Sequence, residues 1–240
     1  MKLKRLNAPA SWPIQRKTKK YIITPNPGPH RRKQSLPLGI IIRDMLGYAR
    51  THSEAQQILM TGVVAVNGVV RKNIRFPVGI MDIVSLGTNH YRVLKKKRLY
   101  LLLDNENKDT KLCRIEDKTA LGKDVVQLNL HNGENIRVTK DTYATGDVLV
   151  MDAHNTIKRV IPFKKGSLAL IIDGTNAGAV GTIREIVVTK GSQPNIVHVT
   201  TERDIPIRKD YVFVIGTTKP VIPVDVYQRE RENPHSSEVG

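Results

Sequence analysis

The sequence predicts an α+β protein in which a basic N-terminal arm precedes three small modules. Apolar residues at helical spacing are followed by a strand–turn–strand pattern around Asn67-Gly68. From residue 99 onward only short strand-like runs occur, separated by turn residues. The length of 240 residues allows one large domain or two to three small ones, at roughly 100–200 residues per domain.

The charge of the chain predicts a polyanionic partner. Lys and Arg total 39 against 22 Asp and Glu, which gives a formal net charge of +17 and a sequence pI near 10.1. The hydrophobic fraction of 40% is sufficient for packed cores, so the chain as a whole is not a disordered basic tail.

Membrane, secreted and disulfide-rich classes are not expected. The longest apolar runs, such as Gly39–Ile42 and Ser167–Ile172, are far shorter than the roughly 20 residues of a membrane helix. No apolar stretch follows the basic N-terminus, so we expect no secretory signal. Because Cys113 is the single cysteine, no disulfide within the chain and no multi-cysteine zinc site can form, which fits a reducing cytoplasm.

Residues 1–35 are predicted to form an extended basic arm. Met1–Arg43 contain eleven Lys and Arg and no acid, and six prolines between residues 7 and 37 exclude a long helix. The cations would neutralise RNA phosphates, and Trp12 would either stack on a base or pack on the protein itself. The predicted RNA contacts of the arm are Lys2, Lys4, Arg5, Trp12, Arg16, Lys17, Lys19, Lys20, His30, Arg31, Arg32 and Lys33.

Residues 36–98 are predicted to form a helix pair followed by a hairpin. Apolar residues from Leu38 to Leu46 recur at i, i+3, i+4, i+7 and i+8, as on a helix with one buried face. A second helix starts at a capping box beginning at either Thr51 or Ser53 and stops near Gly62. Val63–Val66, Asn67-Gly68 and Val69–Arg71 are typical of a strand, a tight turn and a strand.

This order of elements resembles the small RNA-binding domain first described in bacterial small-subunit ribosomal protein four. His52 and Gln56 stand where that domain often has basic residues, which shifts the predicted phosphate contacts to other cations. These are Arg43, Arg50, Arg71, Lys72 and Arg75, followed by the cluster Lys95, Lys96, Lys97 and Arg98. The alternative for these residues is an ordinary solvated face, or for the cluster a separator between domains.

Residues 99–165 are predicted to form a central β-rich module. The strand-like runs are Leu99–Leu103, Val125–Leu130, Ile136–Val138, Val148–Met151 and Ile157–Ile161. We interpret His131 and His154 as turn residues, since neither has a second His or Cys at metal-ligand spacing. Cys113 is interpreted as a small buried residue and not as a nucleophile.

Residues 166–216 are predicted to form a small β-barrel. The run Gly166–Ile183 places two strands around a loop rich in Gly and Asn, without the Gly-Lys-Ser/Thr ending of a nucleotide-hydrolysing loop. It resembles a KOW motif, in which Gly174, Asn176 and Gly178 are the predicted RNA contacts. The runs Ile196–Val199 and Tyr211–Ile215 would complete the barrel. Residues 217–240 are a loosely patterned tail that would become ordered on a partner.

Taken together, the chain closely resembles the four-e family of archaeal and eukaryotic small-subunit ribosomal proteins. The likeness rests on several motifs in a fixed order, among them Ala8-Pro9-x-Ser11-Trp12, Gly28-Pro29-His30, Phe76-Pro77-x-Gly79-x-Met81-Asp82, Lys111-Leu112-Cys113 and the KOW run. It implies a structural component of the cytoplasmic ribosome, with ribosomal RNA and neighbouring ribosomal proteins as partners. It also implies no catalysis, cofactor, metal, membrane or small-molecule substrate.

Two other functions are compatible with single parts of the sequence. The helix-pair domain also accompanies RNA-modifying enzymes such as pseudouridine synthases, but we find no catalytic element of that type among the roughly 140 residues after residue 98. A transcription elongation factor built on the KOW barrel is the second alternative, and co-purification with RNA polymerase would favour it.

Overall fold

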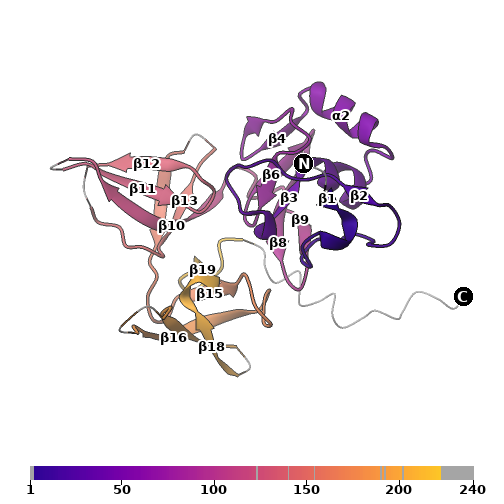
Figure 1. The fold of residues 1–240 in the computed structure, drawn as a ribbon. Helices are drawn as coiled ribbons and strands as arrows, with labels where there is room; N and C mark the ends of the chain where they lie inside the picture. The colour runs from indigo at the N-terminus through magenta and orange to yellow at the C-terminus, as the bar shows by residue number, and fades with distance from the viewer. Residues whose placement is uncertain are drawn as a thin grey trace, which may run out of the picture.

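A computed structural model describes residues 3–122, 124–139, 141–153, 155–189, 191, 193–201 and 203–222. Figure 1 shows three bodies: an N-terminal domain that contains the helices, a central β module and a C-terminal β module. The fold is therefore mixed, with few helices and a β-rich body, in agreement with the α+β prediction. Lys2, His154 and the part of the predicted tail from residue 223 onward lie outside the described residues.

The N-terminal segment folds against the first domain. Strand β1 (Leu3–Lys4) pairs with β2 (Tyr21–Ile22). The short 3-10 turn η1 (Arg5–Asn7) lies between these strands, and a second one, η2 (Arg32–Gln34), follows β2. Trp12 is only 1% exposed and belongs to the hydrophobic core. The segment has no long helix, as its prolines require, but the prediction of an extended arm is wrong in that its apolar side chains are buried.

The predicted helix pair is present. The first helical segment consists of α1 (Leu38–Ile40), which continues into a π-helical turn, η3 (Ile41–Met45). The second is α2 (His52–Met60), whose N-cap Thr51 accepts a hydrogen bond at its Oγ1 from the Glu54 N–H, at 3.2 Å. The first of the two capping alternatives is therefore confirmed. Gly62, with φ +80°, follows the helix end as predicted.

The domain is completed by two antiparallel sheets. Strand β3 (Ser35–Pro37) pairs with β6 (Pro77–Gly79). A five-stranded sheet has the order β5-β4-β7-β8-β9, formed by β4 (Val64–Val66), β5 (Val69–Val70), β7 (Ile83–Leu86), β8 (Asn89–Lys95) and β9 (Leu99–Leu103). Asn67 and Gly68 both have positive φ, as the tight turn between β4 and β5 requires.

The boundary of this domain lies later than the sequence pattern indicated. Strand β9 pairs with β8 along its whole length, so Leu99–Leu103 belongs to the first domain and not to the central module. The basic cluster Lys95–Arg98 ends β8 and forms the turn before β9. It is thus a hairpin connection and not a separator between domains.

The central module is one five-stranded antiparallel sheet with the order β12-β11-β10-β13-β14. Its strands are β10 (Lys111–Ala120), β11 (Val126–Leu130), β12 (Asn135–Val138), β13 (Val148–Met151) and β14 (Ile157–Ile161). The last four match the predicted runs. The long strand β10 was not predicted, because Glu116, Asp117 and Lys118 interrupt its apolar pattern where it leaves the core.

The C-terminal module is also a five-stranded antiparallel sheet, with the order β18-β17-β16-β15-β19. Its strands are β15 (Leu168–Ile171), β16 (Val180–Val187), β17 (Ile196–Thr200), β18 (Asp204–Arg208) and β19 (Val212–Gly216), with a 3-10 turn, η4 (Lys209–Tyr211), before the last. Strand β18 was not predicted. It contains Pro206, which an edge strand tolerates because one side of its backbone needs no ladder partner.

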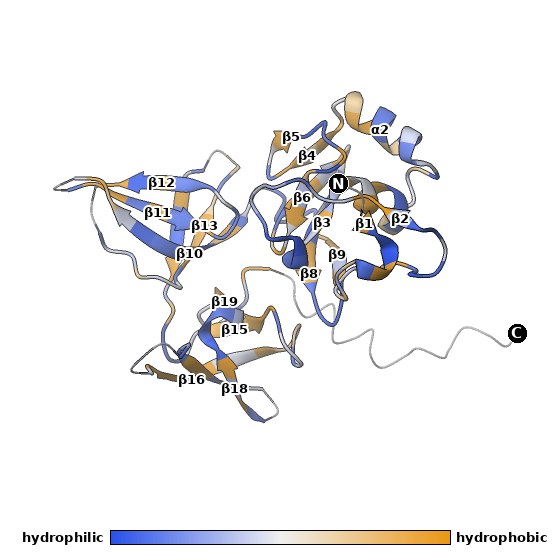
Figure 2. Cartoon of the chain, viewed as in Figure 1, coloured by the Kyte–Doolittle hydropathy of each residue, from blue (hydrophilic) through white to orange (hydrophobic). Residues whose placement is uncertain are grey.

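The three bodies share a hydrophobic core. One cluster of buried residues includes Leu94 of the N-terminal domain, Val150 of the central module and Phe213 of the C-terminal module. A second, smaller cluster around Cys113 and Leu128 lies within the central module alone. Figure 2 shows hydrophobic residues along strands of all three bodies. The modules are therefore packed against one another through apolar side chains.

Candidate nucleic-acid interface

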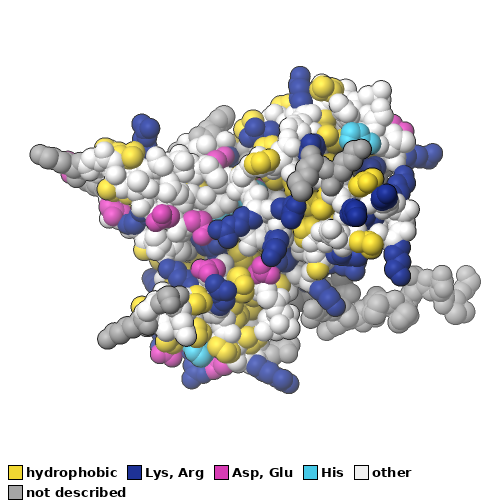
Figure 3. All heavy atoms as spheres, viewed as in Figure 1, with side chains coloured by type: hydrophobic (Ala, Val, Ile, Leu, Met, Phe, Trp, Pro, Cys, Tyr) yellow, Lys and Arg dark blue, Asp and Glu magenta, His cyan; other side chains and the backbone are white. Residues whose placement is uncertain are grey.

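The net positive charge of the chain lies entirely in the N-terminal domain. Residues 1–103 contain 20 Lys and Arg against three Asp and Glu, whereas residues 104–240 contain 19 of each kind. In the view of Figure 3, Lys and Arg side chains gather over this domain, and most of the visible Asp and Glu lie over the other two modules. A one-sided cationic surface is the electrostatic footprint of a polyanion-binding protein.

The three acids of this domain leave most of its cations without neutralisation. Asp44 pairs with the neighbouring Arg43, at 2.7 Å. The Glu54 carboxylate accepts a hydrogen bond from the Arg50 N–H, at 2.8 Å, at the start of α2. Asp82 is buried. The acids therefore serve local structure, and the positive surface potential remains.

The structure exposes eleven of the predicted RNA-binding cations. They are Lys4, Lys17, Lys19, Lys20, Arg31, Arg32, Lys33, Arg50, Lys72, Lys97 and Arg98. A further five, Arg16, Arg43, Arg71, Arg75 and Lys96, are half-buried. Two of the half-buried guanidinium groups also hold the N-terminal segment: Arg16 donates to the Leu6 and Pro9 carbonyls, and Arg75 donates to the Thr24 carbonyl.

Four predicted RNA contacts are wrong because their side chains are buried. Trp12 packs in the core, so the alternative of packing on the protein itself is the correct one. Arg5 donates to the Gln15 carbonyl at 2.6 Å, inside the N-terminal segment. Lys95 forms an ion pair with Asp173 of the C-terminal module, at 2.7 Å. His30 forms an ion pair with Asp82. Side chains that are buried in this way are not available at the surface to contact a phosphate or a base.

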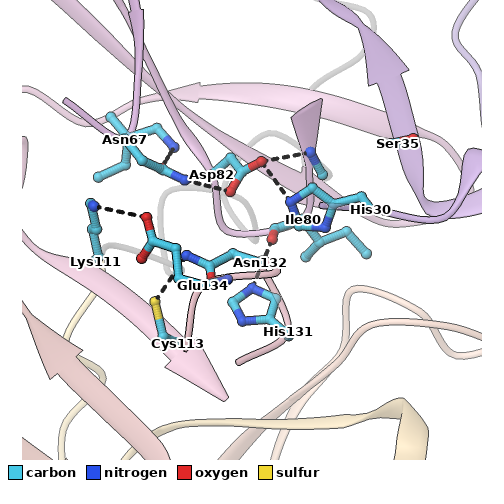
Figure 4. Close-up of polar contacts among 12 residues, drawn as sticks. His30, Ser35, Asn67, Ile80, Asp82, Lys111, Cys113, His131, Asn132 and Glu134 are labelled. Carbon is cyan, nitrogen blue, oxygen red and sulfur yellow. Dashed lines mark hydrogen bonds and ion pairs between the residues drawn. The ribbon is translucent and has the colours of Figure 1, made fainter. Parts of the chain in front are cut away.

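The His30–Asp82 pair fastens the N-terminal segment to the domain (Figure 4). His30 Nε2 and Asp82 Oδ2 are 2.8 Å apart, and both side chains are almost fully buried. Burial opposes the charge on each partner. The facing charges and hydrogen bonds outweigh burial, so the pKa of His30 is raised and the pKa of Asp82 is lowered. Gly79 lies against the His30 ring, where a Cβ would come within 2.3 Å of the ring.

Asp82 also fixes the hairpin turn of the domain. Its Oδ2 accepts a hydrogen bond from the Gly79 N–H, and its Oδ1 accepts one from Asn67 Nδ2, each at 2.8 Å. The Oδ1 of Asn67 accepts in turn from the Ile83 N–H, at 2.9 Å. The motif from Phe76 to Asp82 is therefore a structural link between the N-terminal segment, the β6–β7 connection and the β4–β5 turn.

His131 lies at the junction of the three bodies, which the sequence did not indicate. It occupies a turn, as predicted, but its ring is buried. Nδ1 accepts from the Arg114 N–H at 3.1 Å, while Nε2 lies 3.2 Å from the Ile80 carbonyl of the N-terminal domain. The ring also meets Phe213 of the C-terminal module edge-on, with centroids 5.3 Å apart. Burial, followed by the nearby His30, lowers the pKa of His131 to about 3, so it packs as a neutral ring.

The glycine-rich loop of the C-terminal module is only partly available to RNA. Gly174 and Asn176 are exposed. Gly178 is half-buried, and a Cβ on it would come within 2.3 Å of the Lys96 side chain. The missing side chain of Gly178 makes room for Lys96 of the N-terminal domain, and the RNA contact predicted for Gly178 stays a prediction.

Within the part of the chain that the structure describes, Cys113 and the potential metal ligands do not come together as a metal site. Cys113 is buried, as predicted, and burial raises the pKa of its thiol to about 12. Among the described residues there is no group of three His, Cys, Asp or Glu side chains arranged to hold a metal ion. None of the helices that the structure describes is long and apolar enough to cross a membrane.

The cationic helix-pair domain followed by two β modules defines a protein of the nucleic-acid-binding class. Three family models match the chain: the RS4NT (NUC023) domain over residues 1–33, the S4 domain over 41–84 and ribosomal family S4e over 88–157. The chain belongs to the S4e family of ribosomal proteins.

Curated relatives and a solved structure agree with this family. The small ribosomal subunit protein eS4 of Methanothermobacter thermautotrophicus is 42% identical over 228 residues, covering 92% of this chain and 94% of the relative. That of Methanocaldococcus jannaschii is 42% identical over 234 residues, covering 92% and 96%. The crystal structure of 30S ribosomal protein S4e from Thermoplasma acidophilum is 31% identical, with a TM-score of 0.69, and covers 77% of this chain and 96% of that one.

Proposed function

We propose that the chain is a structural component of the small ribosomal subunit and binds ribosomal RNA through the cationic N-terminal domain. Its curated relatives are small ribosomal subunit proteins. The observation that carries the proposal is the charge distribution: residues 1–103, which include the S4 match over 41–84, hold the entire net charge of +17, and the rest of the chain is neutral. The protein then works in the cytoplasmic ribosome beside other ribosomal proteins.

The RNA-binding residues in this proposal are the exposed cations of the N-terminal domain. Those between Lys4 and Lys33 lie on a segment that packs on the domain, so their positions are largely set before RNA arrives. Preorganised cations bind phosphates at a lower ordering cost than a flexible arm does. The half-buried Arg43, Arg71 and Lys96 contribute where their guanidinium or ammonium groups reach the surface.

The two β modules are proposed to position the cationic domain and to contact neighbouring proteins or RNA by shape. For the C-terminal module we propose a KOW-type small barrel. The glycine-rich loop between β15 and β16, with Gly174 and Asn176 exposed, supports this assignment. The N-terminal segment, the helix-pair domain to residue 103, the central sheet and the C-terminal sheet are the proposed units.

No catalysis is part of this function. The S4e family is one of structural ribosomal proteins and not of enzymes. Three potentially reactive side chains serve the fold instead: the Cys113 thiol is buried, and both His30 and His131 are held in packed contacts.

Binding to a small-subunit ribosomal RNA transcript tests the function. The purified protein is titrated by filter binding between 50 and 200 mM salt. If six to ten phosphates are contacted, affinity falls about 10³- to 10⁵-fold across this range. A large-subunit transcript of similar length is the control for specificity. No binding at low salt, or equal affinity for both transcripts, would contradict the proposal.

A further inference from the structure

A polar cavity lies between the β4–β5 hairpin of the N-terminal domain and the central module. Its volume is about 440 Å³, within the roughly 300–1,000 Å³ of sites that hold small ligands. The wall on the N-terminal side includes Asn67, Val69, Arg71 and Phe76, and Glu134 belongs to the opposite wall. Figure 4 shows Asn67 and Asp82 on one side, with Asn132 and Glu134 on the other.

Two charged side chains of this cavity have unused hydrogen-bonding capacity. The Nε of Arg71 and the Oε2 of Glu134 are buried and have no hydrogen-bond partner among the residues that the structure describes. The other oxygen of Glu134, Oε1, forms a long ion pair with Lys111 Nζ, at 3.5 Å. Buried polar atoms are normally satisfied, so two such atoms at one cavity call for a polar occupant. Asp82, by contrast, is fully engaged by His30, Gly79 and Asn67.

The walls match the two recognition features of an unpaired nucleobase. The Arg71 guanidinium lies over the Phe76 ring, 4.5 Å from its centroid, and such a pair offers a flat surface for stacking. The Glu134 carboxylate accepts hydrogen bonds only, and guanine presents two adjacent donors, N1–H and N2–H, on its Watson–Crick edge. Lys72, which follows Arg71 in the sequence, is exposed.

We propose that this cavity binds an unpaired guanine of RNA, stacked on Arg71 and Phe76 and held at its Watson–Crick edge by Glu134. The inference rests on the proposed RNA-binding function and adds a base-specific site to the sequence-independent phosphate contacts. It gives the junction between two modules a role in recognition: the stacking surface comes from one module and the hydrogen-bond acceptor from the other.

Binding of GMP, IMP and UMP to the full chain tests the guanine site, with NMR titration as the readout. All three carry a phosphate. IMP lacks the 2-amino group, and UMP has a smaller base with no amino group. We expect GMP to bind at least about tenfold tighter than UMP, with IMP between them, because hydrogen bonds to a charged group discriminate by this amount or more. Equal affinities, or no binding of GMP, would overturn the proposal.

Variants locate the site. Glu134→Gln should reduce GMP affinity about tenfold and leave UMP unchanged, whereas the matched change Glu185→Gln on the exposed face of β16 should alter neither. If Glu134→Gln fails to fold, Val69→Trp serves instead: Val69 is 47% exposed and lines the cavity, so a larger ring there should block GMP without lowering the melting temperature. Unchanged GMP binding in the folded variant would overturn the site.

The ribosomal RNA assay separates the two proposals. If the chain binds the small-subunit transcript but does not prefer GMP, the guanine site is wrong and the ribosomal function stands. If the transcript is not bound, both are wrong.

Discussion

The N-terminal domain and the two β modules differ in charge far more than in packing. The first holds 20 Lys and Arg against three acids, whereas residues 104–240, which include the other two, hold 19 of each kind. Yet all three contribute to one hydrophobic core. The comparison supports the proposal that the first region contacts a polyanion, while the other two form a nearly neutral part of the same packed molecule.

The difference is also visible in how charged groups are used. Acids of the β modules pair with nearby cations, as Glu116 does with Arg114 at 2.5 Å and Asp141 with Lys118 at 2.6 Å. In the N-terminal domain, by contrast, Lys and Arg residues far outnumber the acids with which they could pair. Exposed ion pairs contribute little to stability, so the unbalanced cations are better explained by a partner than by the fold.

Charge reversal should reveal the largest difference between the two regions, measured as the loss of RNA affinity. We expect Arg31→Glu, Arg32→Glu and Lys33→Glu together to weaken ribosomal RNA binding about a thousandfold at low salt, since each phosphate contact contributes on the order of tenfold. The salt slope should fall by about three. The matched triple Arg159→Glu, Lys164→Glu and Lys165→Glu, exposed on or after β14, should have a small effect. Similar losses in both triples would refute the comparison.

Removal of the buried Asp82 tests whether the cationic surface depends on the N-terminal anchor. Asp82→Ala leaves His30 and Asn67 without their partner, and we expect the free energy of unfolding to fall by about 3 kcal/mol. Asp44→Ala, which breaks an exposed pair in the same domain, should cost less than about 1 kcal/mol. Chemical denaturation measures both. Equal effects would show that the buried pair is not an anchor.

The junction should respond to acid through His131. Its folded pKa lies near 3, below the usual value of 6.5, so the unfolded chain takes up a proton first as the pH falls below 6.5. Stability is then lost by at most about 1.4 kcal/mol per pH unit, down to a pH near 3. His30 has the opposite sign: its raised pKa stabilises the fold below 6.5, and this gain is lost as the pH rises through the folded pKa.

A His131→Asn variant isolates the first effect. It removes the titrating ring but leaves the His30–Asp82 pair, so the variant should lose less stability than the parent between pH 6.5 and 4. Denaturation curves at several pH values give this difference directly. Parallel pH profiles for the two proteins would show that His131 is not the acid-sensitive group.

The smallest effect is expected from the ion pair between Lys95 and Asp173. The Asp173 side chain is about one third exposed, so solvent weakens the pair, and Asp173→Asn should cost at most about 1 kcal/mol. Ribosomal RNA affinity should stay unchanged, because Lys95 is buried and we exclude it from the interface. A marked change in RNA affinity would return Lys95 to the list of contacts.

Helix caps, tight turns and short alternating strands could be predicted, because each depends on residues that are neighbours in the sequence. The cap at Thr51, the turn at Asn67-Gly68 and four strands of the central module appear where spacing and turn residues placed them. The strands β10 and β18 were missed, since charges or a proline break their alternation. The family resemblance, carried by motifs such as Gly28-Pro29-His30, was confirmed by the comparisons.

The burial of individual cations could not be predicted from the sequence. Arg5, His30 and Lys95 resemble their exposed neighbours in composition, and only contacts over long sequence separations remove them from the surface. His131 was missed for the same reason, because Ile80 and Phe213 meet it from two other modules. The one relevant sequence feature is Gly79, whose missing side chain leaves room for the His30 ring. The sequence alone does not show that these two residues meet.

Lysine protection by RNA tests the central claim most directly. The full chain is acetylated with a water-soluble reagent, free and bound to small-subunit ribosomal RNA, and the sites are quantified by mass spectrometry. Protection should concentrate on the exposed lysines of the N-terminal domain, Lys4, Lys17, Lys19, Lys20, Lys33, Lys72 and Lys97, while Lys108, Lys158, Lys164 and Lys165 stay reactive. Protection spread evenly over both sets, or confined to the second, would contradict the account.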